Sequence, residues 1–161
     1  EGVTPAMSDF EKVKTIHDSF CDYVNYGDMT GADGGTAYGG LVNKRAVCEG
    51  LSRSFLLLCQ RVGLKCIYVS GSLQTNSVED KWDNHAWNYV EVDGKWYMMD
   101  ITEDCGFSGY VNYNGFLIGQ ENAYKGHRLA TAKNGQLTGG DPNALHYGTL
   151  PALNNTDYPW R

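Results

Sequence analysis

The sequence predicts an α+β domain in which a buried helix packs against an antiparallel β-sheet. Residues 45–62 place apolar side chains at helical spacing, with further apolar residues on the opposite side. Residues 83–92 alternate in the manner of a strand, and a second short strand, 95–100, follows after Asp93-Gly94. An Asp-Gly pair between two such strands is a strong signal for a two-residue hairpin turn.

The first expected element is an amphipathic helix over residues 8–23. Ser8 and Glu11 have the spacing of a capping box at its start. His17 lies on this helix beside charged residues, and we predict that it is a solvated or boundary residue. The apolar residues that recur at helical spacing are Phe10, Val13, Ile16, Phe20 and Val24.

Glycines punctuate residues 25–40, with Asp28 and Asp33 between them. A calcium or phosphate loop is one interpretation of such a segment. It lacks, however, the alternating carboxylates of an EF-hand and the Lys-Ser/Thr ending of a phosphate-binding loop. We therefore predict a surface connection that leads to the central helix.

The central helix, predicted over residues 45–62, carries Cys48 in its first turn and ends before Gly63, a typical left-handed stop. We expect this helix to be buried nearly all round. A helix N-terminus has a partial positive charge and unpaired N–H groups, and both favour a thiolate over a thiol. Cys48 is therefore a candidate nucleophile. The competing interpretation is a small core residue.

A strand is expected over residues 65–70, where β-branched and aromatic side chains follow one another. The next segment, 71–81, is predicted as a polar loop. In the hairpin that follows, Asp93-Gly94 as the turn places Val92 opposite Lys95 and Trp87 opposite Asp100.

This hairpin register makes His85 the diagonal neighbour of Asp100 on one face of the ribbon. The carboxylate could then fix the imidazole tautomer and leave the other ring nitrogen for a thiol, as in a catalytic triad. A slip of one residue would put the two side chains on opposite faces and remove the basis for this prediction.

The remainder of the chain has weaker signals. Residues 102–114 are expected to be irregular, and 115–119 to form a short apolar strand. Residues 134–161 are rich in Asn, Gly, Pro and Thr, so we predict an irregular tail or linker. His146, within this tail, is interpreted as a surface residue.

Length and composition limit the class of protein. The chain has 161 residues, a length that predicts a single domain over residues 1–161. Its content of 42% hydrophobic residues is sufficient for a hydrophobic core. A net charge of −6 argues against binding to nucleic acid and anionic membranes. No apolar run is long enough to insert into a bilayer. Since the chain begins at Glu1, we expect it to be part of a longer, multidomain protein.

The five cysteines contain no Cys-x-x-Cys pair, so we predict no metal site. If Cys48 is a free nucleophile, the other four allow up to two disulfides in three connectivities. We favour mostly buried thiols over disulfides for these four residues. They are Cys21, Cys59, Cys66 and Cys105.

Several motifs together resemble the transglutaminase-like superfamily, whose core is the Cys-His-Asp half of a papain-like fold. The segments that carry the resemblance are Ala46-Val47-Cys48-Glu49-Gly50-Leu51-Ser52, Val62-Gly63-Leu64-Lys65-Cys66, Val69-Ser70-Gly71, His85-Ala86-Trp87-Asn88 and Trp96-Tyr97-Met98-Met99-Asp100-Ile101-Thr102. The family often has Asp-Pro-Thr or Asp-Thr-Thr where this chain has Asp100-Ile101-Thr102. The resemblance implies a papain-like fold with a core over residues 36–128.

The resemblance also implies the catalytic residues Cys48, His85 and Asp100. In the family, the segment before the cysteine helix lines the site, so Tyr38 is a candidate oxyanion donor or else a packed aromatic. Trp82 and Trp87 flank His85, and they either wall the site or pack the core. A histidine often follows the last core strand in bacterial relatives. His127 has this place here, and we favour a position outside the site.

The expected chemistry is cysteine-dependent acyl transfer through a thioester, without a metal or organic cofactor. We favour hydrolysis of peptide or amide bonds in a protein or peptide substrate, with cell-wall peptide as one candidate. The alternatives are a cross-linking transglutaminase with an amine acceptor and a non-catalytic module that binds peptide or cell wall. The missing start, polar tail and low lysine content favour a secreted or cell-surface bacterial protein.

Overall fold

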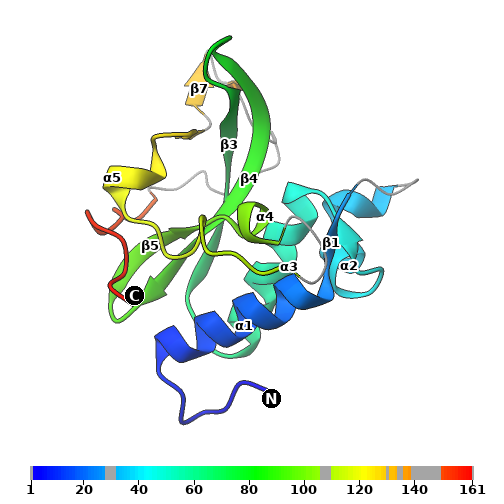
Figure 1. Ribbon diagram of the computed structural model, residues 1–161, viewed down its shortest axis with the longest axis vertical. Coiled ribbons are helices and arrows are strands. Elements are labelled where there is room, and N and C mark those ends of the chain that lie inside the picture. The colour runs from blue at the N-terminus through cyan, green and yellow to red at the C-terminus, as the bar shows by residue number, and fades with distance from the viewer. Residues whose placement is uncertain are drawn as a thin grey trace.

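The computed structural model describes residues 2–27, 32–105, 110–129, 131–133, 136–138 and 150–160 (Figure 1). His146 lies outside the described residues. In chain order the elements are α1 (Asp9–Tyr23), β1 (Asn25–Tyr26), the 3-10 turn η1 (Ala32–Gly35), α2 (Ala37–Leu41), β2 (Arg45–Ala46), α3 (Cys48–Arg61), β3 (Cys66–Asn76), β4 (Lys81–Val92), β5 (Lys95–Met99), α4 (Ile101–Asp104), α5 (Gln120–Ala123), β6 (His127–Leu129), β7 (Thr131–Lys133) and β8 (Gln136–Thr138).

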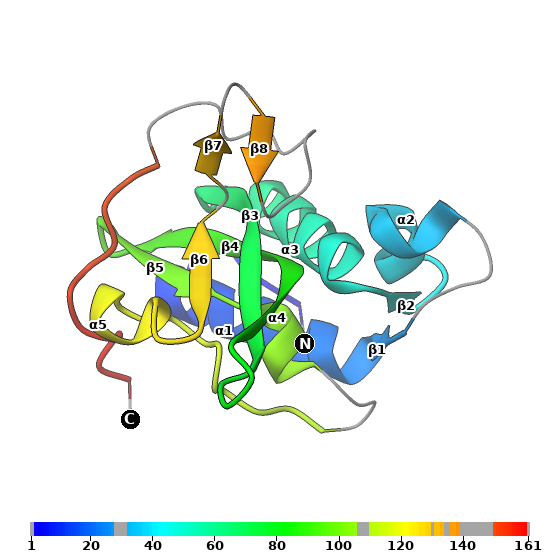
Figure 2. The same ribbon diagram turned by 90° about the horizontal axis from the view of Figure 1, so that it is seen from above.

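A four-stranded sheet with the order β5-β4-β3-β6 forms the centre of the fold, and all of its neighbouring strands are antiparallel. The main core lies where α1 and α3 pack on β4 and β5. A second cluster on Trp87 and Tyr89 is covered by Ala123 of α5 and Leu153. Figure 2 shows α3 running beside β3 and β4. The predicted α+β class, a helix packed on an antiparallel sheet, is confirmed.

Helix α1 begins as its capping box predicts, because the Ser8 hydroxyl and the Glu11 carboxylate each accept from the other's backbone N–H. The expectation for His17 on this helix is wrong. The side chain is fully buried, with Nδ1 2.8 Å from Asp18 Oδ1 and Nε2 3.1 Å from Asp104 Oδ2. Since Asp104 belongs to α4, this histidine joins two helices that are far apart in the sequence.

The central helix α3 starts at Cys48 rather than at residue 45, because Arg45 and Ala46 form β2 and pair in parallel with β1. Its inner face buries Leu51, Phe55 and Cys59. The expected burial nearly all round is too broad, since Leu57 is 48% exposed. Helix α3 therefore has one buried face and one face that reaches solvent.

The predicted surface connection over residues 25–40 is only partly correct, since it contains β1, η1 and most of α2. Two glycines let these segments approach α3. A Cβ at Gly50 would lie 2.3 Å from the Gly34 carbonyl oxygen, and a Cβ at Gly40 would lie 2.2 Å from Ser54 Oγ. The glycines thus bring this segment against the N-terminal part of α3, where Cys48 lies.

The prediction of a polar loop over residues 71–81 is correct only for the turn at 77–80 and wrong for the rest. Strand β3 continues to Asn76 and pairs with β4 from Cys66↔Val90 to Asn76↔Lys81, which makes a long hairpin arm at the top of Figure 1. Polar side chains are tolerated in this arm because its end projects into solvent, where Val78 is 94% exposed. The polar composition reflects that exposure and not an absence of strand pairing.

A disulfide joins Cys21 of α1 to Cys105 at the end of α4. Cys48, Cys59 and Cys66 are free thiols. The preference for thiols at four positions is therefore wrong for one pair and correct for the other.

The predicted strand over 115–119 is reduced to an isolated bridge between Ile118 and Met98. In the predicted irregular tail, β8 pairs with β7, and Leu153 is buried and forms a bridge with Trp96. Residues 150–160 therefore pack onto the sheet, while the domain limits remain a prediction.

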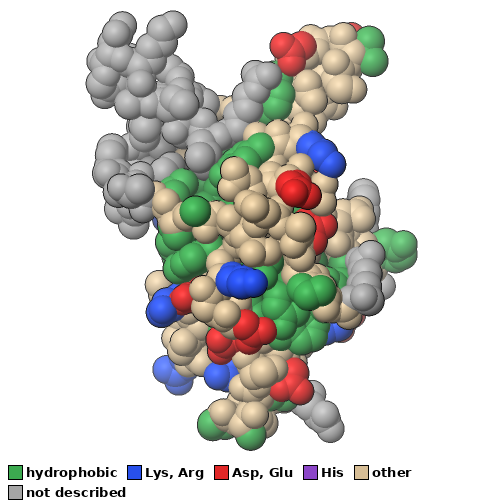
Figure 3. Space-filling model, turned by 90° about the vertical axis from the view of Figure 1, so that its left-hand side faces the viewer, with side chains coloured by type: hydrophobic (Ala, Val, Ile, Leu, Met, Phe, Trp, Pro, Cys, Tyr) green, Lys and Arg blue, Asp and Glu red, His purple; other side chains and the backbone are tan. Residues whose placement is uncertain are grey.

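Within the described ranges, no helix combines the length and apolar character needed to cross a bilayer. Figure 3 shows one face, on which acidic and basic side chains are interspersed with small hydrophobic groups.

Candidate active site

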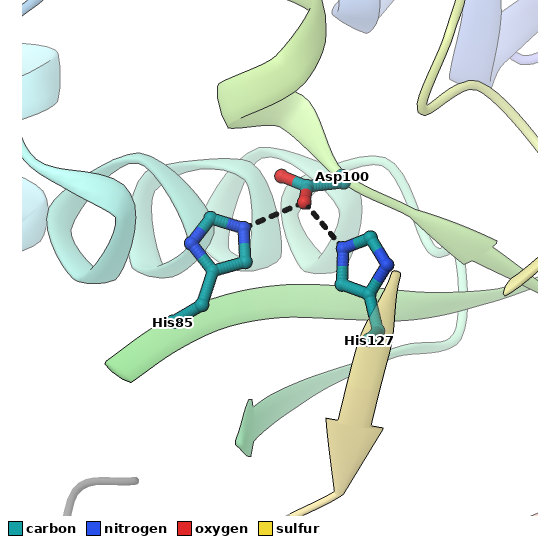
Figure 4. A group of neighbouring side chains, drawn as sticks. All are labelled: His85, Asp100 and His127. Atoms are coloured by element: carbon teal, nitrogen blue, oxygen red, sulfur yellow. Dashed lines mark hydrogen bonds and ion pairs between the residues drawn. The ribbon is translucent and has the colours of Figure 1, made fainter. Parts of the chain in front are cut away.

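The hairpin between β4 and β5 has the predicted register, with Val92 opposite Lys95 and Asn88 opposite Met99. Continued by one residue, this pairing brings Trp87 level with Asp100 and makes His85 the diagonal neighbour of Asp100. The two side chains meet as expected, and His85 Nε2 lies 2.6 Å from Asp100 Oδ2 (Figure 4).

Asp100 is completely buried at the junction between β5 and α4. Its Oδ1 caps α4 by accepting the Thr102 backbone N–H at 3.1 Å, which leaves Oδ2 for the histidine. On the other side, the Asp100 N–H donates to the Gly115 carbonyl at 2.9 Å, and a Cβ at Gly115 would lie 2.4 Å from the Asp100 carbonyl oxygen. The local backbone therefore holds the carboxylate in one orientation.

Burial alone would raise the pKa of Asp100, but hydrogen bonds from His127 and His85 outweigh it and hold the pKa well below its usual range. Burial likewise opposes the charged form of His85, which is 7% exposed. Asp100 and the side chain of Cys48 reverse that effect and raise the pKa of His85 to about 10. The environment of His85 therefore favours an imidazolium.

Cys48 is half-buried and reduced, and it is the first residue of α3. Its side chain interacts with the His85 ring. Because Nε2 of His85 is bonded to Asp100, Nδ1 is the nitrogen left for the sulfur; Figure 4 shows it on the ring side away from Asp100. The N-cap residue Val47 makes no side-chain hydrogen bond to the helix end. The first-turn N–H groups therefore have no capping side chain as a competitor for an oxyanion.

His127, which we expected outside the site, is part of it, so that expectation is wrong. Its Nε2 lies 2.8 Å from the same Asp100 Oδ2 (Figure 4), and its Nδ1 lies 3.1 Å from the Ala123 carbonyl oxygen. Pairing of β6 with β3, in which His127 faces Leu73, brings it there. The segment around His127 has no periodicity that predicts this pairing, so local sequence could not have found the contact.

The three residues predicted as an oxyanion donor or as walls of the site occupy different environments. Trp87 is fully buried, and its ring lies 6.0 Å from that of His85 and 5.0 Å from that of His127. Trp82 lies on the β4 part of the hairpin arm, where its indole N–H donates to Asp80. Tyr38 is 56% exposed on α2. Trp87 thus forms a wall beside both histidines, and roles for Tyr38 and Trp82 remain predictions.

His85, Asp100 and His127 place one ligand atom each within 4.8 Å of one another, the one such group found among the described residues. Both Nε2 atoms are at hydrogen-bond distance from Asp100 Oδ2. A metal ion would displace the proton from each of these contacts. Hydrogen bonds account for the spacing, and we interpret the group as a proton-bonded cluster.

Several known proteins are similar to this chain. The family model of the transglutaminase-like superfamily matches residues 1–101. Kyphoscoliosis peptidase from Mus musculus and from Homo sapiens is 28% and 27% identical to this chain in alignments of 111 residues, and each alignment covers 63% of this chain. The chain spans only 17% of the length of these two relatives.

Two solved structures resemble part of the chain. The crystal structure of a TGase has 22% identity and a TM-score of 0.49, over 60% of this chain and 27% of that one. An arylamine N-acetyltransferase from Bacillus cereus, with a Cys-His-Glu triad of its own, has 19% identity and a TM-score of 0.48, over 66% of this chain and 45% of that one. The family model, which covers more than half of the sequence, decides the assignment. This chain belongs to the transglutaminase-like superfamily.

Proposed function

We propose that the chain is a cysteine-dependent acyl-transfer enzyme with Cys48 as nucleophile, His85 as general base and acid, and Asp100 as the residue that orients His85. The proposal rests on two successive interactions. The Cys48 side chain interacts with the His85 ring, and the His85 ring contacts the buried Asp100 carboxylate. Desolvating a buried carboxylate is costly, and unlike the buried pair of Asp104 and His17, this one leads through its histidine to a reduced thiol. A reaction that moves a proton between sulfur and nitrogen uses this arrangement directly.

In the first half of the reaction, the Cys48 proton passes to His85, and the sulfur forms a bond to the substrate carbonyl carbon. The carbon–nitrogen bond then breaks, and the His85 imidazolium gives its proton to the leaving amine. The product is a thioester on Cys48. In the second half, water attacks the thioester and loses a proton to His85, and the carbon–sulfur bond breaks to release the acid and regenerate Cys48.

Hydrolysis is the favoured outcome over transfer to an amine. The matched relatives from mouse and human are named peptidases, which supports water as the acceptor. Transfer to a lysine amine would share every step up to the thioester, so the triad geometry alone suits both reactions. The substrate class we propose is protein or peptide, with cell-wall peptide as one candidate.

An oxidising compartment is consistent with the disulfide between Cys21 and Cys105, since such bonds persist mainly in secreted or surface proteins. We therefore propose secretion or display at the cell surface, and retain a bacterial source as a prediction.

The direct test is mass spectrometry of peptide mixtures incubated with the protein. Cleavage products should appear with the wild type and with Cys66→Ala, a control that removes another free, partly buried thiol. They should be absent with Cys48→Ala. Adding a glutamine peptide and a fluorescent amine tests the alternative, and covalent incorporation of the amine would identify a transglutaminase instead.

A module that only binds peptide or cell wall is the second alternative. It has no need of a reactive sulfur, so its Cys48 should react with iodoacetamide near neutral pH no faster than a free thiol. A markedly faster rate at Cys48, read from the mass of its peptide, would support the enzyme.

A further inference from the structure

The His127 ring has an unusual pair of partners. Its Nε2 faces the Asp100 carboxylate at 2.8 Å, and its Nδ1 faces the Ala123 carbonyl oxygen at 3.1 Å. The Ala123 carbonyl can only accept, and so can the ionised Asp100 carboxylate. The His127 side chain is 5% exposed, so little water is available to replace either contact.

A neutral imidazole has one N–H and one lone pair. In either tautomer, neutral His127 would direct a lone pair at an acceptor oxygen in a buried site, which is costly. Only a ring with protons on both nitrogens satisfies the two contacts at once. Two ring N–H donors therefore match the two acceptor oxygens when Asp100 is ionised.

We propose that His127 is a cationic positioning residue that holds the Asp100 carboxylate in place and repels the proton carried by His85. This inference rests on the proposed function. With Cys48 as thiolate and His85 as imidazolium, the four side chains sum to zero charge, which lowers the cost of burying them. The rings of His85 and His127 lie 5.7 Å apart, close enough for their charges to oppose each other.

The repulsion matters in the second half of the reaction. His85 must then be neutral to accept a proton from water, yet Asp100 still favours its charged form, although Cys48 is by then an uncharged thioester. The Nε2 atoms of His85 and His127 contact the same oxygen of Asp100. A positive charge on His127 therefore weakens the stabilisation that Asp100 gives to the proton on His85. His127 thereby increases the fraction of His85 that is neutral and able to accept a proton in deacylation, while leaving it hydrogen-bonded to Asp100.

The surroundings of His127 support a charged ring. Asp100 faces it from the start of α4, His85 from β4, and Glu103 lies with it along a cavity of about 310 Å³. Asp157 lines the same cavity, but it accepts hydrogen bonds from Asn122 and the Gly119 N–H.

The pKa of Glu103 is raised by burial and by Asp100, and His127 acts on it in the opposite direction. His127 thus has the acidic side chains of Asp100 and Glu103 beside it on this side of the cluster.

The first test is ¹⁵N NMR of the imidazole rings in the wild-type protein near neutral pH, with the His127 signals assigned by their loss in His127→Gln. We expect both ring nitrogens of His127 to be protonated. A ring with one unprotonated nitrogen would overturn the proposal, and loss of the same signals in His127→Asn gives the assignment if His127→Gln fails to fold. No substrate is needed, so this result is independent of whether the proposed reaction occurs.

The second test follows the alkylation rate of Cys48 by iodoacetamide against pH in wild type and His127→Gln. Glutamine can still donate to Asp100 but carries no charge. Loss of the repulsion should move the titration step of His85 upward by about one to two pH units, from two unit charges at this separation and an effective dielectric constant of about 20 to 40. An unchanged step would mean that His127 is only a structural brace.

His17→Gln is the matched control, because His17 is also buried between two acceptors, Asp18 and Asp104, and it does not contact Asp100. It should leave the Cys48 profile unchanged, and an equal shift in both variants would contradict a specific role for His127. If wild-type Cys48 alkylates no faster than a free thiol, the proposed function fails, while the NMR result on His127 stands separately.

Discussion

Replacing Asp100 with asparagine removes the one negative charge that contacts both histidines. Asn has nearly the same shape, but its amide cannot accept from His85, His127 and the Thr102 N–H as the carboxylate does. One of these donors must then face the NH₂ group. We expect Asp100→Asn to fold with reduced stability and to lose most of the reactivity of Cys48.

The size of the effect follows from the short contact. Unit charges centred about 4 Å apart interact by about 4 kcal/mol at an effective dielectric constant near 20, which corresponds to about three pKa units. Without Asp100, the pKa of His85 should therefore fall from about 10 toward its ordinary value. Leaving the histidine cation without its buried partner should lower the free energy of unfolding by about 3–5 kcal/mol.

The assay is the iodoacetamide rate at Cys48 between pH 5 and 10, read by peptide mass because Cys59 and Cys66 are also free. At pH 7 an ordinary thiol is only a few per cent ionised, so loss of the imidazolium partner should slow alkylation by more than about tenfold.

The matched control is Asp104→Asn, which removes another buried carboxylate of α4. Asp104 bonds a different histidine, His17, and the Gly115 N–H. This variant should lose comparable stability in urea unfolding and keep the wild-type alkylation profile. If Asp100→Asn also kept that profile, the assignment of Asp100 as the partner of His85 would be refuted.

Three further predictions concern stability and pH. Gly50→Ala should destabilise the fold by about 1–3 kcal/mol in urea, although Ala normally favours helices, because its Cβ would lie 2.3 Å from the Gly34 carbonyl oxygen; a gain in stability would contradict the close packing. Reducing the Cys21–Cys105 bond, 84 residues apart, should cost about 4–5 kcal/mol on loop entropy, checked by thermal unfolding with and without reductant. The raised pKa of His85 contributes stability that is complete below about pH 6.5 and is lost as pH rises to about 10, so the free energy of unfolding should decline across that window; a flat profile would show that His85 is not charged in the folded protein.

The contact between His85 and Asp100 was predictable from the sequence, whereas the place of His127 was not. Because the side-chain period of a strand is two, the turn at Asp93 was enough to predict that His85 and Asp100 share a face, and they meet at 2.6 Å. His127 contacts the same carboxylate from 27 residues further along. It arrives through pairing of β6 with β3, which no local pattern announces.

The errors have physical causes of the same kind. Polar residues 71–81 suggested a loop, yet antiparallel pairing with β4 extends β3 to Asn76, since a projecting arm can be polar. His17 looked solvated among charged neighbours, and it is buried because α4 brings Asp104 against it. In each case a partner remote in the sequence changed the environment of the residue.

The sequence by itself determined the helix that begins near Cys48, the hairpin register and the pairing of His85 with Asp100, because these depend on local periodicity and one short turn. Only the tertiary structure decided the place of His127, the burial of His17 and the bond between Cys21 and Cys105. Those features depend on how distant segments pack together, and the composition of a segment carries little information about which remote surface will cover it.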